Sequence, residues 1–127
     1  MMNDTKRKIR ILKIEPQKAP YEKEIVDELE DIQAVVNGPI QCIYLNGGCL
    51  LVCNEEGKLN GMQLNRRIGN DIITGPFFIV GVNIYGEFVS LTDGQIESFA
   101  EEFREIEMFN TEEFRERSVI KFSELGF

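Results

Sequence analysis

The sequence of 127 residues predicts an α+β domain, in which two principal helices cover one face of a mainly antiparallel sheet of four to five strands. Two observations lead to this prediction. Short apolar runs bounded by glycine and proline recur between residues 8 and 91, as is typical of strands. Two amphipathic segments flank the central runs instead of alternating with them, which disfavours a parallel sheet. The expected order is β-α-β-β-β-β-α plus a short C-terminal element.

The first strand is expected at Lys8–Ile14, where apolar and basic residues mix at strand-like spacing. The next element is expected to be an amphipathic helix, because apolar residues recur at helical spacing. Asn37-Gly38-Pro39 should end this helix, since glycine suits a left-handed cap and proline cannot continue the helix. Its apolar face carries Ile25, Val26, Leu29, Ile32 and Val36.

A β-hairpin is predicted from two apolar runs, residues 40–45 and 49–54. A two-residue turn at Gly47-Gly48 would place Cys42 opposite Cys53 in a hydrogen-bonded pair. All three cysteines lie in apolar strand sequence, so we expect buried thiols that stay reduced. Two further strands are expected within residues 72–91, with a turn near Tyr85-Gly86.

The second helix should begin at Thr92, because Thr92 and Gln95 form a capping-box sequence. Its apolar face is expected to carry Ile96, Phe99, Ala100, Phe103 and Ile106. Asn110-Thr111 should break this helix, after which residues 111–117 are compatible with a short helix and residues 118–122 with an edge strand. The whole of 1–127 is expected to be one domain with a basic N-terminal extension of about 1–7.

The most polar part of the chain is a predicted loop from Asn54 to Asp71, long enough to suggest a function. One interpretation is a recognition surface, where Arg66 and Arg67 would hold a carboxylate or phosphate. The other is structural, with one arginine returning to Glu55, Glu56 or Asp71 and fixing the loop. The candidate binding residues are Asn54, Glu55, Glu56, Lys58, Asn60, Asn65, Arg66 and Arg67.

Several chemistries are not expected. The chain has no histidine, which removes Ser–His and Cys–His nucleophile pairs and the commonest metal ligand. The three cysteines have no fourth ligand at a zinc-site spacing. Adjacent Glu55 and Glu56 point in opposite directions on an extended segment, which disfavours a paired-carboxylate site with Asp71. We therefore predict no catalytic residues, no metal site and no cofactor.

Charge and hydropathy restrict the partners and the compartment. Acidic residues outnumber basic ones, 22 to 14, for a net charge of −8, so we do not expect nucleic-acid binding. An acidic surface increases solubility or provides a binding surface for a basic partner. No apolar run approaches the ~20 residues of a membrane helix, and no signal peptide is recognised. The cytoplasm is the expected location.

The carboxylates of the second helix suggest another role, because rows of them can imitate DNA phosphates. Glu97, Glu101 and Glu105 lie one turn apart, and Glu112 and Glu116 would continue the row. The arginines that interrupt the row favour an ordinary solvated face. They are Arg104, Arg115 and Arg117.

Several strings in order, from ILKIEPQKAPYEKEI to CNEEGKLNG, NDIITGPFFIVG and FVSLTDGQIE, carry a family resemblance. They resemble the family known as domain of unknown function 3846, from about Ile9 to about Phe114. The resemblance implies a phage or conjugative-element context and supplies no site residues. The expected function is a non-enzymatic accessory or binding protein with a protein partner. The alternatives are a DNA-mimicking inhibitor of a restriction enzyme and a small carboxylate-dependent enzyme. The oligomeric state is left open.

Overall fold

A computed structural model describes residues 6–109 of the chain. Its main sheet is antiparallel throughout and has the strand order β2-β1-β7-β4-β3, with β8 pairing with the free part of β7. The strands are β1 Lys8–Ile14, β2 Tyr21–Val26, β3 Ile40–Leu45, β4 Cys49–Asn54, β7 Phe77–Val82 and β8 Phe88–Val89. Two further strands, β5 Leu64–Ile68 and β6 Asp71–Thr74, form a separate hairpin.

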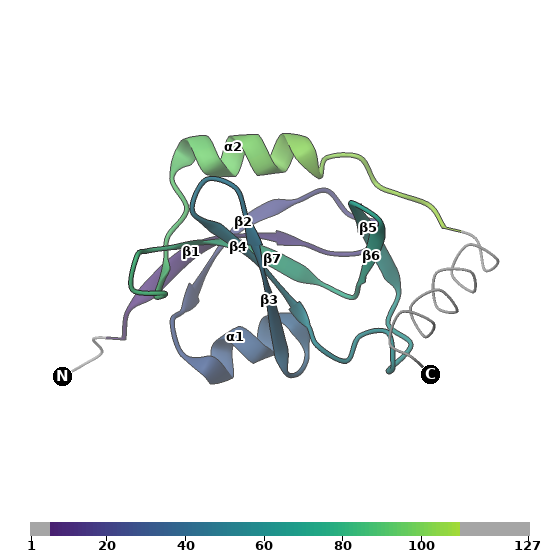
Figure 1. Ribbon diagram of the computed structural model, residues 1–127, viewed down its shortest axis with the longest axis horizontal. Coiled ribbons are helices and arrows are strands. Elements are labelled where there is room, and N and C mark those ends of the chain that lie inside the picture. The colour runs from purple at the N-terminus through teal and green to yellow at the C-terminus, as the bar shows by residue number, and fades with distance from the viewer. Residues whose placement is uncertain (1–5, 110–127) are drawn as a thin grey trace.

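The two helices, α1 Leu29–Val36 and α2 Asp93–Glu102, lie on opposite sides of this sheet (Figure 1). Strand β4 shows the consequence. Leu50 and Val52 join the core under α1, whereas Cys49 and Leu51 join the core under α2. The α+β class, the mainly antiparallel sheet and the two helices are confirmed, but the helices cover both faces, not one. Uninterrupted apolar strands such as β4 are typical of a sheet that is covered on both sides.

The first helix is shorter than predicted. Ile25 belongs to β2, where it pairs with Ile9 of β1, and the helix begins only at Leu29. The apolar spacing around Ile25 suited a helix, but pairing with β1 outweighed this local pattern. The stop signal acted as expected, because Asn37 is the C-cap in the left-handed conformation, with φ 64°.

The β3–β4 hairpin has a three-residue loop, in which Gly47 and Gly48 have φ values of 79° and 71°. This loop shifts the register by one residue from the two-residue prediction. Cys42 therefore faces Val52 instead of Cys53. The three thiols are free, but Cys42 is exposed, so the prediction that all three are buried was wrong. Cys42 lies on β3, which is the last strand of the sheet among residues 6–109.

The predicted loop from Asn54 to Asp71 contains strand β5, which pairs with β6 across a turn at Gly69. This hairpin was missed because β5 has the sequence LNRRI, and polar residues are uncommon in buried strands. Tertiary hydrogen bonds, described below, make these residues compatible with burial.

The capping box at Thr92 is confirmed, with both of its reciprocal hydrogen bonds to Gln95 present. Helix α2 ends at Glu102, so Ile106 lies beyond it and is 45% exposed. The predictions for residues 110–127, including Glu112 and Glu116, lie outside the described residues. Between residues 6 and 109 no helix is long and apolar enough to cross a membrane.

Candidate functional site

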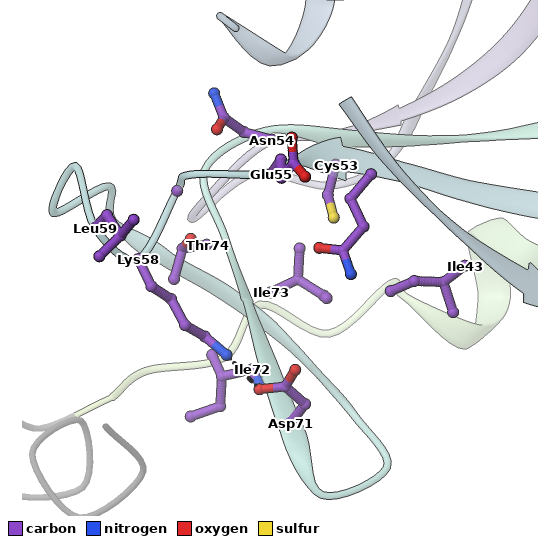
Figure 2. A pocket seen from close by; sticks show the side chains of 12 residues that line it. Ile43, Cys53, Asn54, Glu55, Lys58, Leu59, Asp71, Ile72, Ile73 and Thr74 are labelled. Atoms are coloured by element: carbon purple, nitrogen blue, oxygen red, sulfur yellow. Dashed lines mark hydrogen bonds and ion pairs between the residues drawn. The ribbon is translucent and has the colours of Figure 1, made fainter. Parts of the chain in front are cut away.

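A cavity of about 210 Å³ lies between the β5–β6 hairpin, the turn that follows β4 and the outer strand β3 (Figure 2). Its apolar surface includes Ile43 of β3, Ile72 and Ile73 of β6, and Leu59 of the turn. The polar groups around it belong to Gln41, Asn54, Glu55, Lys58, Asp71 and Thr74. We call this cavity the hairpin pocket.

The turn that closes the hairpin pocket is held by hydrogen bonds within 54–62. The amide of Asn60 donates to the carbonyl of Glu56 at 2.9 Å, and that of Met62 donates to Gly57 at 2.9 Å. Gly57 lies against β6, where an added Cβ would come within 2.3 Å of the Thr74 hydroxyl oxygen. A glycine is therefore required for the turn to approach β6 this closely.

Asn54 fixes the start of this turn and is 5% exposed. Its Nδ2 donates to the carbonyl of Val36 at the end of α1, at 3.0 Å. Its Oδ1 accepts from the Glu56 amide at 2.7 Å. Both polar atoms of the side chain are thus used within the protein, which makes Asn54 a structural residue and not one that faces a ligand.

Asn65 and Arg66 are also buried, with 0% and 1% of their surface exposed. Asn65 Nδ2 donates to the carbonyls of Ile14 and Gly75, at 3.0 and 2.8 Å. Asn65 Oδ1 accepts from Arg66 Nη1 at 2.8 Å. These contacts fasten β5 to the end of β1 and to the residue that follows β6.

The Arg66 guanidinium extends this network to two distant segments. Its Nε donates to the carbonyl of Phe103 at the end of α2, at 3.1 Å, and its Nη2 donates to the carbonyl of Lys18, at 2.7 Å. Burial lowers the pKa of Arg66 from its usual value. The carbonyls at a helix C-terminus carry partial negative charge, so the end of α2 stabilises this cation.

Arg67 points elsewhere and forms an ion pair with Glu107, with Nε and Oε1 3.2 Å apart. Its guanidinium carbon also lies 5.1 Å from the centre of the Phe109 ring. The structural interpretation expected an arginine to contact Glu55, Glu56 or Asp71. Arg66 instead donates to backbone carbonyls and to Asn65 Oδ1, and Arg67 pairs with Glu107, so the two residues do not form an outward-facing pair.

The remaining candidates surround the opening of the hairpin pocket or the turn. Lys58 Nζ pairs with Asp71 Oδ1, which also accepts from the Ile72 amide at 2.8 Å (Figure 2). Glu55 and Asn60 are exposed, as is Glu56. Within residues 6–109 the Glu55 carboxylate has no ion pair, because Lys58 is bound to Asp71. Glu55 is therefore the carboxylate at the pocket that is available to a ligand.

The Cys53 thiol forms part of the pocket surface but is only 4% exposed. Burial is the main cause that raises its pKa to about 11, so the thiol is neutral at pH 7 and a poor nucleophile. No group of three potential metal ligands occurs in the part of the chain that the structure describes. The pocket offers charge and hydrogen bonds to a ligand, and its residues hold no nucleophile beside a base.

Sequence reasoning missed the contributions of Gln41, Ile43 and Thr74 to the pocket. These residues come from β3 and β6 and meet the turn only through the tertiary fold. The one local signal was Gln41, a polar residue within the apolar run IQCIYL.

The acidic surface of α2 is interrupted by cations in the structure as well as in the sequence. Arg104 Nη2 lies 3.3 Å from Glu101 Oε2, and Arg67 pairs with Glu107. Arg66, Arg67 and Arg104 therefore lie among the carboxylates at the end of α2.

A family model described as "Domain of unknown function (DUF3846)" matches residues 9–104. No curated protein and no solved structure matches the chain.

Proposed function

Since the chain belongs to the DUF3846 family, whose function is unknown, we propose that it is a non-catalytic binding protein that holds a basic side chain of a protein partner in the hairpin pocket. We further propose that it acts in the cytoplasm as an accessory protein of a phage or conjugative element.

The observation that carries the proposal is the charge at the pocket opening. Lys58 neutralises Asp71, which leaves the exposed carboxylate of Glu55 without a counter-charge in residues 6–109. Charge-assisted hydrogen bonds from an arginine or lysine to such a carboxylate are stronger than neutral ones. The net charge of −8 also attracts a cationic partner over longer range.

The shape and surface of the pocket suit a single long side chain. Its volume of about 210 Å³ is below the roughly 300–1,000 Å³ of pockets for drug-sized ligands. Lysine and arginine carry an aliphatic stem below the charged head. The stem would lie on Ile43 and Ile73, and the head would reach Glu55 and the amide oxygen of Gln41.

Inhibition of a DNA-binding protein by phosphate mimicry is the second candidate, but the interrupted surface of α2 counts against it. A mimic needs a continuous row of carboxylates, whereas Glu101 and Glu107 are paired with arginines. A carboxylate-dependent enzyme would need a base with a raised pKa next to a reacting group. The pocket supplies only Glu55 and the paired Asp71, so binding is favoured over catalysis.

A comparison of Glu55→Lys with Glu56→Lys tests the proposal. Both residues are exposed acidic neighbours, but only Glu55 lines the pocket. Affinity capture from host lysate should retain a protein with the wild type and with Glu56→Lys, and lose it with Glu55→Lys. Arginine-containing peptides from that protein should bind the wild type in a fluorescence assay. Replacing their arginine by citrulline should weaken the binding at least tenfold.

Equal capture by both variants would reject the pocket as the site. If no protein binds the wild type, or if the citrulline peptides bind equally well, the proposed recognition of a basic side chain is wrong.

A further inference from the structure

The two ends of the main sheet differ in a way that the hairpin pocket does not explain. Strand β2 at one end presents Glu22, Lys23 and Glu24, all exposed. Strand β3 at the other end has the sequence IQCIYL, without a charge, a proline or a bulge. Proteins commonly protect an edge strand from pairing with another chain by charged residues, proline or bulges. By this criterion β2 is protected, and within residues 6–109 β3 is open to pairing.

The register of the β3–β4 hairpin identifies the backbone groups on the open edge. The Glu55 amide donates to the Pro39 carbonyl at 2.8 Å, so this pair is hydrogen-bonded. Hydrogen-bonded and non-hydrogen-bonded pairs alternate along an antiparallel ladder. Residues 41, 43 and 45 are therefore bonded to β4, and the amides and carbonyls of residues 40, 42 and 44 point away from it.

We propose that β3 pairs with β3 of a second copy of this chain, so that one antiparallel sheet runs through a symmetric dimer. The three outward-pointing residues are spaced symmetrically about Cys42. A twofold axis at Cys42, perpendicular to the sheet, places Ile40 opposite Tyr44 of the second copy and Cys42 opposite its own equivalent. This single register satisfies the outward backbone groups of residues 40, 42 and 44 in both chains.

The side chains of β3 suit pairing with a second copy of the same strand, and the lack of charge along β3 permits this approach. Tyr44 is 77% exposed, and opposite Ile40 it would form an aromatic–β-branched pair, which stabilises a sheet. Two chains with a net charge of −8 repel each other over most of their surface. The uncharged edge at β3 is a place where two such chains can approach without bringing like charges into contact.

Cys42→Lys tests the dimer because it would place two ammonium groups opposite each other at the axis. Cys42 is exposed, so the chain should still fold, which circular dichroism and melting would check. In sedimentation equilibrium the wild type should show twice the mass of one chain, and Cys42→Lys the mass of one chain. Cys42→Ser, and Lys23→Ala at the other edge, should remain dimeric.

Hydrogen exchange measured by NMR gives a second test, which compares the wild type with Cys42→Lys. In the dimer the amides of Ile40, Cys42 and Tyr44 should be protected as well as those of residues 41, 43 and 45. In Cys42→Lys only the first three should become fast, by at least tenfold. A wild type that sediments as one chain would overturn the proposal, and protection of all six amides in such a monomer would assign the edge to another segment of the same chain.

The dimer and the binding of a basic side chain in the hairpin pocket are independent proposals, and the variants distinguish them. Cys42→Lys should still bind the arginine-containing peptides, whereas Glu55→Lys should still dimerise. A dimer that is lost in Glu55→Lys but not in Cys42→Lys would contradict pairing through β3.

Discussion

Two sets of polar residues, close together in sequence, have opposite environments around the hairpin pocket. The inner set, Asn54, Asn65 and Arg66, is at most 5% exposed and directs its hydrogen bonds to protein atoms. The outer set, Glu55, Lys58 and Asp71, surrounds the pocket opening. Polarity alone therefore did not identify surface residues in this segment. The inner set shapes the pocket, and the outer set is the part that can select a ligand.

Removing Arg66 should have the largest effect on stability. Arg66→Met keeps an apolar stem but leaves the carbonyls of Phe103 and Lys18 and Asn65 Oδ1 without their donor. A buried acceptor without a partner costs about 1–3 kcal/mol, so we expect a loss of about 3–4 kcal/mol in the free energy of unfolding. Urea denaturation measures this loss.

Arg67→Met is the matched control for Arg66→Met. The Arg67–Glu107 pair is partly exposed, with side-chain exposures of 37% and 28%, so its loss should cost less than about 1 kcal/mol. Equal effects of the two substitutions would mean that the distinction between the inner residue and its neighbour is wrong.

Asn65→Ala should come next, with a loss of about 2–3 kcal/mol, because the carbonyls of Ile14 and Gly75 lose their side-chain donor. The same substitution at exposed Asn60 should change the free energy of unfolding by less than about 0.5 kcal/mol. Thermal melting of the pair would show the difference. A large effect at Asn60 with none at Asn65 would reverse the assignment of the two asparagines.

These two sets explain how much of the site was predictable. The eight candidates were identified as polar residues in one segment, and Asn54, Glu55 and Lys58 do line a pocket. The burial of Asn65 and Arg66 was not predictable. Their hydrogen-bond partners include Ile14, Lys18 and Phe103, all more than 35 positions away in the sequence. Sequence spacing alone could not place these carbonyls beside β5.

More of the fold than of the site could be predicted, because several of its signals are local in the sequence. Capping and stop signals are local, so the box at Thr92 and the end of α1 at Asn37 were both found. Strand β2 pairs with β1, but the apolar spacing around its Ile25 suggested a helix. The β5–β6 hairpin contains Asn65 and Arg66, whose hydrogen-bond partners are distant in sequence, and these polar residues suggested a loop. The uninterrupted apolar run CLLVCN is a sequence feature that favours a sheet covered on both faces.

The Cys53 thiol lies with the inner set and predicts a loss of stability at alkaline pH. Its pKa rises from 9.0 to about 11 in the folded protein, mainly through burial. The folded state therefore holds this proton more tightly than the unfolded state. Its stabilising contribution is complete below about pH 9 and is lost as the pH rises towards 11.

We expect this single group to reduce the free energy of unfolding by about 2 kcal/mol over that range. Urea denaturation at several pH values should show the decrease, and the decrease should be smaller in Cys53→Ala. If the variant and the wild type lose the same stability between pH 9 and 11, the effect comes from other groups.

A small effect on stability should come from the outer ion pair of Lys58 and Asp71. Their side chains are 32% and 41% exposed, and pairs of this kind contribute about 0–1 kcal/mol. Lys58→Met should therefore cost less than 1 kcal/mol, and the difference from wild type should shrink at high salt, because ions screen exposed charges. Melting at low and high salt measures both.

The same substitution sharpens the comparison between the two sets, because it removes the cation that pairs with Asp71. The loss of one positive charge makes the pocket opening more negative, so a basic peptide should bind more tightly at low salt. Lys58→Met is thus expected to weaken the fold slightly and to strengthen binding. A destabilisation near that of Arg66→Met, independent of salt, would place Lys58 in the inner set and remove the physical basis for a pocket that selects charge.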